Sequence, residues 1–407
     1  MAPYPSTSPL RQRRRPTRRT IGLAGAGLAA AVVLAACGSS SPSSSGPGSS
    51  VGGAGNTPTT AAAKPSSLSA ELSSLEAKPS GKVALTEDGS SLLYPLYQTW
   101  AAGYAKASPG FSSTSGADGS GTGIADAESG TTVLGASDAY LPPGTSTQYP
   151  TLENIPMAIS AQMINYNLPG LAGTHLKLDG KVLAGMYQGT ITNWDAPAIK
   201  ALNPGVTLPN LKVVPLHRSD SSGDSFLFTS YLADSDPASF AGKQGPSTSP
   251  SFPSVPGALA EKGNSGMVAG CAATKGCVAY IGISYKADTT KANLGEAMLQ
   301  NKSGSYELPS PATIHAEASG YTSIPTNGAI SLIYGSAKNG YPIINFEYIV
   351  VKTDQSSSTT AAGVKAFLAW CIDPNHGNQA SYLDTVGFQP LPAGGLAVSL
   401  DLIKKIS

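Results

Sequence analysis

The sequence predicts an α/β protein with two lobes, and three observations support this class. Short apolar runs that favour strands alternate with segments that favour helices along most of the chain. Glycine- and serine-rich turns connect a strand to a helix at three places. The predicted folded part, Gly81 to Ser407, is large for a single core, so we expect two lobes.

The elements follow from the apolar pattern. Residues 92–100 are expected to form an amphipathic helix with Pro95 in its first turns. We expect strands over residues 82–85, 132–136, 211–216, 278–281 and 348–351. In sheets of this kind, ligands lie beyond the carboxyl ends of the strands, at strand-to-helix turns.

The segment from His217 to Phe226 is the strongest candidate for a ligand site. It places Arg218 beside four serines, a glycine and two carboxylates, directly before an apolar run. If a helix starts at Ser221 or Ser222, its free N–H groups favour an anion, and the guanidinium suits a tetrahedral oxyanion. The same residue types are also common helix N-caps, so this segment alone does not establish a site.

The carboxylates of this segment limit which anions a site here could bind. An acceptor aimed at an anion stabilises it only if that anion still carries a proton. Phosphate does so at neutral pH and sulfate does not. Two other turns, over residues 88–92 and 116–124, share the glycine and serine composition. In a fourth element, over residues 135–139, Asp138 comes just past a short apolar strand. Asp138 could equally be a capping residue.

The N-terminus predicts export. Six arginines precede an apolar stretch over residues 21–36, which is short for a membrane span and ends in Leu34-Ala35-Ala36-Cys37. This order resembles a bacterial lipobox with Cys37 as the lipidated residue. Whether the Sec or the twin-arginine route exports the chain stays open. The following Ser-, Gly- and Pro-rich segment is expected to be a disordered tether, with room for a short helical turn over residues 71–77.

The net charge limits the kinds of partner that the mature chain can have. Removal of the six N-terminal arginines leaves 20 Lys and Arg against 25 Asp and Glu, a formal charge of −5. This excess of acid argues against nucleic acid as a partner.

Cys271 and Cys277 flank a turn-like loop and could close a small disulfide in an oxidising compartment. Cys371 lies in an apolar run and is expected to be a buried thiol on a helix.

Several motifs together resemble a known family. They are Asp88-Gly-Ser-Ser-Leu-Leu-Tyr-Pro-Leu-Tyr97, the Gly-Ser-Gly turn at 119–121, Gly135-Ala-Ser-Asp138 and His217-Arg-Ser-Asp-Ser-Ser-Gly-Asp224, with further matches at 189–194, 263–271, 276–282 and 388–392. In this order and spacing they resemble the phosphate-binding lipoprotein of the high-affinity phosphate ABC transporter, in its actinobacterial form. The resemblance covers nearly all of residues 81–407.

The resemblance implies a type II periplasmic-binding-protein-like fold, with two lobes joined by two crossover strands. It implies that Asp138 accepts the ligand's proton, that Arg218 pairs with the anion and that Asp220 holds the guanidinium. The phosphate-binding residues that it implies are Ser91, Leu92, Ser120, Asp138, Arg218, Ser222, Gly223 and Asp224. The division expected for the chain is a signal peptide over 1–36, a tether over 37–80, lobe I over 81–160 and 345–407, and lobe II over 161–344.

Two positions depart from the family pattern. Leu92 replaces a common phenylalanine, which a backbone contact tolerates. Asp224 replaces a threonine found in some branches, so it loses a hydroxyl donor and adds an acceptor. Asp224 either takes a second phosphate proton or turns toward Arg218, and the sequence leaves both open.

The implied function is capture of phosphate and its delivery to an ABC permease. The protein would be an extracytoplasmic monomer anchored to the cell membrane through lipidated (palmitate-bearing) Cys37, without a cofactor or metal. A protein for sulfate or molybdate is the main alternative, and an additional adhesive role stays open. An enzyme is disfavoured because the one Gly-x-Ser-x-Gly match, at 48–52, lies in the tether and the histidines lack metal-binding spacing.

Overall fold

A computed structural model of the chain describes residues 65–77, 81–142, 144–241 and 245–407. The strands are β1 (Val83–Gly89), β2 (Phe111–Ser115), β3 (Leu134–Ser137), β4 (Leu152–Tyr166), β5 (Lys177–Leu178), β6 (Val214–Arg218), β7 (Leu259–Glu261), β8 (Cys277–Gly282), β9 (Gly295–Glu296), β10 (Met298–Gln300), β11 (Tyr306–Glu307) and β12 (Ile344–Lys352). The α-helices are α1 (Pro65–Leu75), α2 (Tyr94–Ala107), α3 (Ser120–Ser129), α4 (Thr145–Gln148), α5 (Gly180–Tyr187), α6 (Pro197–Leu202), α7 (Gly223–Ser235), α8 (Gly263–Ala273), α9 (Lys286–Lys291), α10 (Pro311–Ala318), α11 (Ser358–Ile372), α12 (Ala380–Leu383) and α13 (Ala393–Lys404). Short helical turns of other types span η1 (Pro237–Ala241), η2 (Ile283–Tyr285) and η3 (Asp384–Val386).

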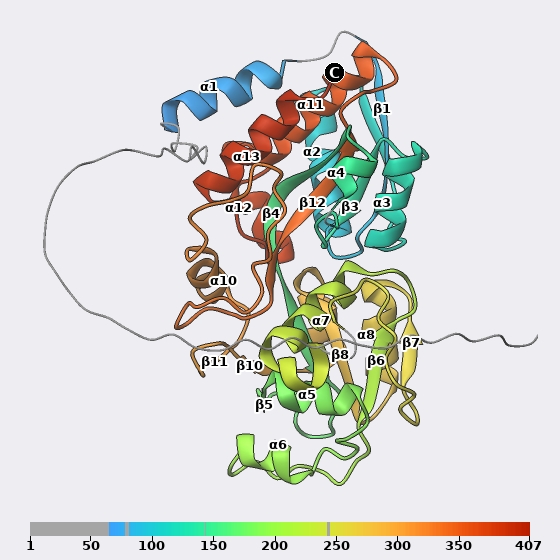
Figure 1. Ribbon diagram of the computed structural model, residues 1–407, viewed down its shortest axis with the longest axis vertical. Helices are drawn as coiled ribbons and strands as arrows, with labels where there is room; N and C mark the ends of the chain where they lie inside the picture. The colour runs from blue at the N-terminus through green and yellow to red at the C-terminus, as the bar shows by residue number, and fades with distance from the viewer. Residues whose placement is uncertain (1–64, 78–80, 143, 242–244) are drawn as a thin grey trace, which may run out of the picture. The chain divides into compact units, whose positions relative to one another are not determined.

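The main sheet orders its strands so that two of them connect two lobes. Within the described residues the order is β2-β1-β3-β12-β4-β8-β6-β7, and β9 pairs with β4. Strands β5, β10 and β11 form a separate small sheet. We call the layer of β1, β2 and β3 with its helices lobe I, and the layer of β6, β7 and β8 with its helices lobe II (Figure 1).

Helices cover both faces of the lobe I sheet. Strand β1 runs parallel to β2 and β3, and β12 pairs antiparallel with β3. Neighbouring residues of β12 point to opposite faces, as a strand requires. Val350 belongs to a small apolar cluster with Ala127 of α3, whereas Val351 belongs to the large core that includes Phe367 of α11. The lobe is therefore a three-layer α/β arrangement, as the alternation of elements predicts.

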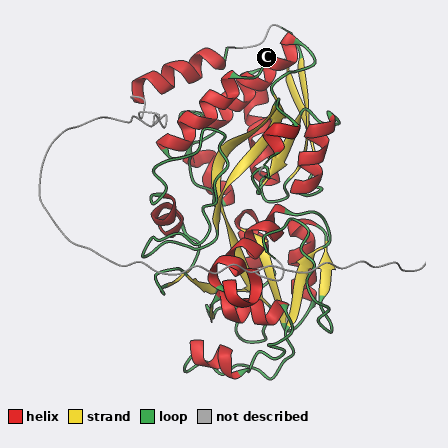
Figure 2. Cartoon of the chain, viewed as in Figure 1, coloured by secondary structure: helices red, strands yellow, loops and turns green. Residues whose placement is uncertain are grey.

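Lobe II repeats this arrangement around β6. Strands β7 and β8 both run parallel to β6 (Figure 2). Every residue of β8 is buried, which is typical of a strand with helices on both faces. Helix α7 packs on β8 and on α5, and α8 packs on β6 and β8.

Strand β4 crosses from lobe I to lobe II. Its residues 152–161 pair with β12, and its residues 162–166 pair with β8 (Figure 1). Strand β12 is the second crossover strand, because it pairs with both β3 and β4. This is the two-strand connection that the family resemblance implies. The predicted lobe boundaries at 160/161 and 344/345 remain a proposal.

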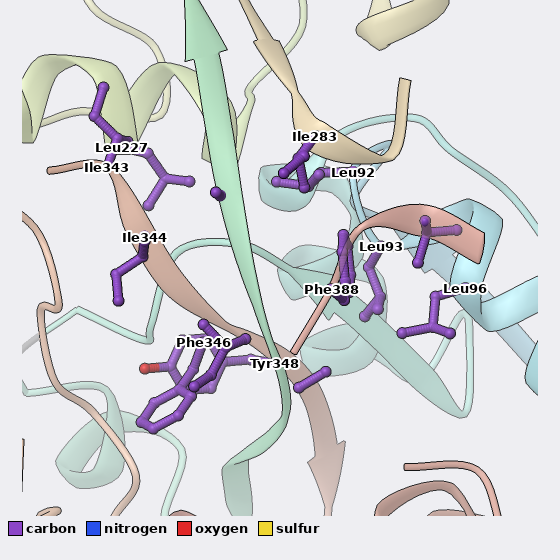
Figure 3. Packing of buried hydrophobic residues seen from close by; sticks show 14 of the residues in the cluster. Leu92, Leu93, Leu96, Leu227, Ile283, Ile343, Ile344, Phe346, Tyr348 and Phe388 are labelled. Carbon is purple, nitrogen blue, oxygen red and sulfur yellow. The ribbon is translucent and has the colours of Figure 1, made fainter. Parts of the chain in front are cut away.

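The core is continuous along these crossover strands. Figure 3 shows Ile344, Phe346 and Tyr348 of β12 beside β4, with Leu92 and Ile283 packed nearby. All five side chains are at most 4% exposed. Burial of large apolar groups at about 25 cal/mol per Å² is the main stabilisation of such a layer. The burial of these side chains makes the crossover region part of the folded core.

The predicted elements largely agree with the structure, but several ends differ. Strand β3 begins at Leu134 instead of residue 132, and β12 begins at Ile344 instead of residue 348. Helix α2 begins at Tyr94 instead of residue 92, because the Ser90 hydroxyl oxygen accepts from the N–H groups of Leu92 and Leu93 and holds them in a turn. Strand β6 begins at Val214, three residues later than expected, because Lys212 makes only an isolated bridge to Asn193.

The predicted tether is too long at its C-terminal end. Residues 65–75 form helix α1, and Leu68 and Leu72 bury their side chains at 8% and 1% exposure. The helix packs on α11 and α13, and Glu76 accepts a hydrogen bond from His376 at 3.2 Å. Composition predicted disorder here because Ser-rich segments bury little apolar surface, but leucines at a four-residue spacing give this segment an apolar face.

Residues 1–64, which include the predicted signal peptide, Cys37 and the first part of the predicted tether, lie outside the described residues. Among the residues that are described, none of the helices combines the length and the apolar character needed to cross a membrane.

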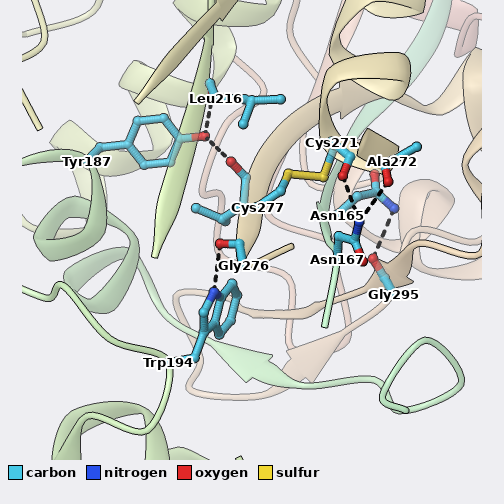
Figure 4. Close-up of a disulfide and its surroundings, with 11 residues drawn as sticks. Asn165, Asn167, Tyr187, Trp194, Leu216, Cys271, Ala272, Gly276, Cys277 and Gly295 are labelled. Atoms are coloured by element: carbon cyan, nitrogen blue, oxygen red, sulfur yellow. Dashed lines mark hydrogen bonds between the residues drawn. A yellow bond between two sulfur atoms is a disulfide. The ribbon is translucent and has the colours of Figure 1, made fainter. Parts of the chain in front are cut away.

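A disulfide joins Cys271 and Cys277, the pair that the sequence suggested (Figure 4). Cys271 lies near the end of α8 and Cys277 opens β8, so the bond closes the short turn between them. Asn167 donates to the carbonyl oxygen of Cys271 at 2.9 Å, which ties the turn to the end of β4. Cys371 is a buried free thiol on α11, as expected.

Replacing both Cys271 and Cys277 with alanine is expected to lower the free energy of unfolding by about 2 kcal/mol, because the cross-link restricts the unfolded chain over a short loop. Urea unfolding followed by circular dichroism measures the change. The wild type under reducing conditions should show the same loss, and the double variant should not respond to reductant. Equal urea midpoints for the oxidised wild type and the variant would contradict the prediction.

Candidate functional site

The candidate site lies where the carboxyl ends of β1, β3 and β6 face one another between the lobes. Lobe I supplies the turn after β1, the start of α3 and the residue after β3. Lobe II supplies the loop between β6 and α7 and the start of α8. This is the position at which open α/β sheets bind ligands. The structure therefore gathers the four turns that the sequence singled out.

Arg218 ends β6 and is held by two carboxylates. Its Nε donates to Asp220 Oδ1 at 2.8 Å, and a second guanidinium nitrogen, NH2, donates to Asp220 Oδ2. Its NH1 donates to Asp224 Oδ2 at 2.8 Å. Burial opposes the charge of the guanidinium, but the hydrogen bond with Asp220 and the charge of Asp224 outweigh it and raise the pKa of Arg218. The guanidinium is thus charged and fixed in direction, and Asp220 holds it as predicted.

The Asp224 side chain turns toward Arg218. Its Oδ2 accepts from Arg218 and from Asn264 Nδ2, the latter at 2.7 Å, and its Oδ1 accepts from Gln162 Nε2 at 3.0 Å. Burial raises the pKa of Asp224, and the charge of Arg218 acts against this. Three donors therefore satisfy the carboxylate. Of the two alternatives that the sequence left open, the structure has the one in which Asp224 faces the arginine.

Ser222 caps helix α7, as the sequence predicted. Its hydroxyl oxygen accepts from the N–H of Ser225 at 3.3 Å. The first N–H groups of a helix have no acceptor within the helix, so those of Gly223 and Asp224 are available to an anion. A Cβ atom on Gly223 would lie 2.5 Å from both Asp138 Oδ2 and Ser120 Oγ. Only glycine allows this approach of the helix to lobe I.

Asp138 is a buried carboxyl on the lobe I side of the candidate site. It is 2% exposed, and Ser90 donates its hydroxyl to Asp138 Oδ1. The Asp138 N–H donates to Ser120 Oγ at 3.2 Å. Burial, followed by the charge of Asp224, raises the pKa of Asp138 to about 7, against the effect of the Ser90 hydrogen bond. The carboxyl therefore changes its protonation near neutral pH.

The turn after β1 meets the start of α8. Ser91 Oγ accepts from the N–H of Asn264 at 3.1 Å and from Asn264 Nδ2 at 3.0 Å. The Ser91 hydroxyl proton remains to be donated. The N–H of Leu92 donates to Ser90 Oγ, and the Leu92 side chain is fully buried. The predicted residues Ser91 and Leu92 thus lie at the site, with the Leu92 N–H engaged within its own turn.

The two lobes touch each other around the site. The N–H of Gly121 in lobe I donates to the carbonyl oxygen of Ser221 in lobe II at 2.9 Å. Lys262 and Asp118 form an exposed ion pair at 2.5 Å across the same boundary. The two lobes are therefore in contact beside the candidate site.

Sequence reasoning missed three residues of this network. Ser90, Gln162 and Asn264 each bond directly to Asp138 or Asp224. Asn264 lies in a family-like motif, but nothing in that motif indicates a contact with Asp224. Arg218, by contrast, could be singled out from the sequence, because it is the only arginine after residue 36.

Fold and site together define a solute-binding protein with two lobes, and the comparisons agree. Residues 62–375 match the model of the PBP superfamily domain. The phosphate-binding protein PstS of Xylella fastidiosa is 30% identical over 317 residues, which cover 78% of this chain and 84% of the relative. PstS 2 of Mycobacterium tuberculosis is 30% identical over 329 residues, covering 77% and 84%.

The chain therefore belongs to the PstS family of phosphate-binding proteins within this superfamily. Solved structures share the fold at lower identity. A phosphate-binding protein from Stenotrophomonas maltophilia has a TM-score of 0.60 at 21% identity and covers 78% of this chain and 93% of its own. The periplasmic phosphate-binding protein PfluDING, solved with bound phosphate, has a TM-score of 0.61 at 19% identity, covering 77% and 92%.

Proposed function

We propose that this protein binds inorganic phosphate between its two lobes and delivers it to an ABC permease for import. The observation that carries the proposal is the placement of a buried carboxyl, Asp138, in lobe I and a fixed cation, Arg218, in lobe II around one site. The relatives are phosphate-binding proteins. Members of the family bind and transport a solute, so the chain is not an enzyme, as the sequence predicted.

Phosphate would be held by donors from both lobes. A buried multiply charged anion is stable only if its oxygens are hydrogen-bonded, and each charge-assisted hydrogen bond contributes about 1.5–3 kcal/mol. Arg218 and the N–H groups at the start of α7 supply donors from lobe II. Ser91 and Ser120 supply hydroxyls from lobe I. The predicted set, Ser91, Leu92, Ser120, Asp138, Arg218, Ser222, Gly223 and Asp224, stands as the proposed ligand shell. Within it Leu92 holds the turn of Ser91, because its own N–H donates to Ser90 Oγ, and Asp224 contributes its N–H and not its carboxylate.

Asp138 favours phosphate over sulfate and molybdate, the alternative ligands. An ionised Asp138 accepts the proton that phosphate retains, whereas fully ionised sulfate would place an unprotonated oxygen against it. Sites built on such polar pairing reject a mismatched ligand by about 10⁴-fold or more. Titration calorimetry with phosphate, sulfate and molybdate at pH 8 tests the proposal. Equal or tighter binding of sulfate would overturn it.

Delivery would depend on lobe closure and on attachment to the membrane. The two crossover strands β4 and β12 allow a hinge between the lobes, and the closed form would present both lobes to the permease. The resemblance implies a monomer, tethered to the outer face of the cell membrane through Cys37. Helix α1 would then mark the point at which the tether joins the folded body.

Replacing Cys37 with alanine is expected to release the protein from the membrane, because a lipid chain on this residue would be its only hydrophobic anchor in the proposal. Detergent phase partition of cells that express the variant measures the release. The matched control, Cys371→Ala, alters the buried cysteine and should stay in the detergent phase. A Cys37→Ala protein that still partitions into detergent would refute the anchor.

A further inference from the structure

A second buried carboxyl, Glu347 of β12, lies against Asp138. Its side chain is fully buried, and in the register of β12 with β3 the next residue, Tyr348, pairs with Ser137, the residue before Asp138. Glu347 Oε1 lies 2.6 Å from Ser160 Oγ and accepts from Asn345 Nδ2 at 3.0 Å. Glu347 Oε2 is buried and has no hydrogen-bond donor among the described residues.

The fold holds Glu347 in this position. The pairing of β12 with β4 shifts register between Glu347 and Tyr348, where Pro156 faces Tyr348 and Ala158 faces Glu347. Such a bulge redirects a side chain. Asn345 Nδ2 also donates to the carbonyl oxygen of Asp138 at 3.3 Å, which ties the two segments together. The pairing of β12 with β3 and β4 therefore places Glu347 beside the segment of Asp138.

Two ionised carboxylates accept hydrogen bonds and donate none, so a close buried pair must hold a proton. Asp138 already receives the Ser90 hydroxyl, and the charge of Arg218 favours its ionised form. Oε2 of Glu347 receives no such donor. Burial and then the charge of Asp138 raise the pKa of Glu347 well above its usual value. Glu347 is thus the better carrier of the shared proton.

We propose that Glu347 keeps a proton and donates it to Asp138, which preserves the Asp138 carboxylate as the acceptor that distinguishes phosphate from sulfate. This inference rests on the proposed function. Glu347 is a positioning residue, because it acts through Asp138 and does not touch the ligand. The other charged groups whose fields reach the pair are Arg218 and Asp224 of lobe II, and Tyr348 follows on β12.

Two variants of Glu347 separate this role from simple packing. Glu347→Leu removes the donor, so Asp138 should become protonated at higher pH and tolerate sulfate. We expect the ratio of sulfate to phosphate dissociation constants at pH 7.5 to fall at least about tenfold, the equivalent of one pKa unit. Glu347→Gln retains an N–H donor and an oxygen acceptor, and it should restore the ratio to within about threefold of the wild type.

Sulfate binding as a function of pH gives a second readout. The pH below which sulfate binds should move upward in Glu347→Leu and not in Glu347→Gln. The matched control is Glu317→Gln, which removes a buried carboxyl of α10 that has no contact with the site. Its sulfate profile should follow the wild type. An unchanged selectivity ratio in Glu347→Leu, or an equal loss in both Glu347 variants, would overturn the inference.

Infrared difference spectra keep the test decisive if Glu347→Leu does not fold. At pH 8 the wild type should show a protonated carboxyl band that disappears in Glu347→Gln. If the wild type and Glu347→Gln do not differ by such a band, the inference is overturned. A separate result would refute the proposed function. If the wild type does not prefer phosphate to sulfate, phosphate binding itself is refuted, whereas normal preference with an insensitive Glu347 refutes only the donor.

Discussion

Arg218→Ala is expected to weaken phosphate binding by at least about a hundredfold. The substitution removes the guanidinium that both Asp220 and Asp224 contact, so two carboxylates would be left to repel the ligand. Removing one partner of a buried ion pair typically costs about 3–5 kcal/mol. A hundredfold change in affinity corresponds to about 2.8 kcal/mol. Titration calorimetry with phosphate at pH 8 measures the loss.

Two further variants show whether charge alone explains the effect. Arg218→Lys keeps a positive charge but cannot reach both carboxylates with a planar fork, so we expect an intermediate loss. Lys262→Ala removes an exposed cation at the edge of the same site, where its ion pair with Asp118 is solvated and contributes little. Its affinity should change less than about threefold. Unchanged phosphate affinity in Arg218→Ala would remove the arginine from the site.

Asp138→Asn is expected to reduce the preference for phosphate over sulfate by at least about a hundredfold. The aspartate accepts a ligand proton only while it is ionised, and an asparagine amide can donate to an unprotonated sulfate oxygen. Leaving a buried polar group unpaired costs about 1–3 kcal/mol, more for a charged group, and the substitution relieves this cost for sulfate. Competition titrations with both anions measure the change in preference.

The raised pKa of Asp138 gives this selectivity a pH dependence. Since the pKa is raised to about 7, the carboxyl is ionised at pH 8 and protonated at pH 5.5. A protonated Asp138 donates, so sulfate should bind the wild type more tightly as the pH falls through this range. Asp138→Asn does not titrate, and its sulfate affinity should stay nearly constant. A wild type whose sulfate affinity is flat over this range would contradict the role of Asp138.

The predicted fold agreed with the structure wherever residues close in the chain decide the outcome. The helix start at Ser222 depends on one hydroxyl and one N–H three residues later, so a local motif was enough. The tether failed at residues 65–75 for the opposite reason. That segment is helical because Leu68 and Leu72 pack on α11 and α13, which come from the other end of the chain.

The candidate site also has features that the sequence predicted and features that it did not. Its turns, its arginine and the carboxyl of Asp138 were recognisable because each motif is short. The direction of the Asp224 carboxylate was not, since it depends on Asn264 and Gln162, which come from α8 and β4. Residues that bond to one another from distant elements carry no mark of it in their own segments.

From its sequence alone this protein could be assigned alternating α/β layers, a capped helix beside Arg218 and the kinds of group that recognise an oxyanion, because these follow from local patterns. Only the tertiary structure decided that the Asp224 carboxylate accepts from the arginine and that Asn345 links Glu347 to Asp138. Burial and the distance between charged groups set their pKa values and hydrogen bonds, and folding brings those groups together from distant parts of the chain.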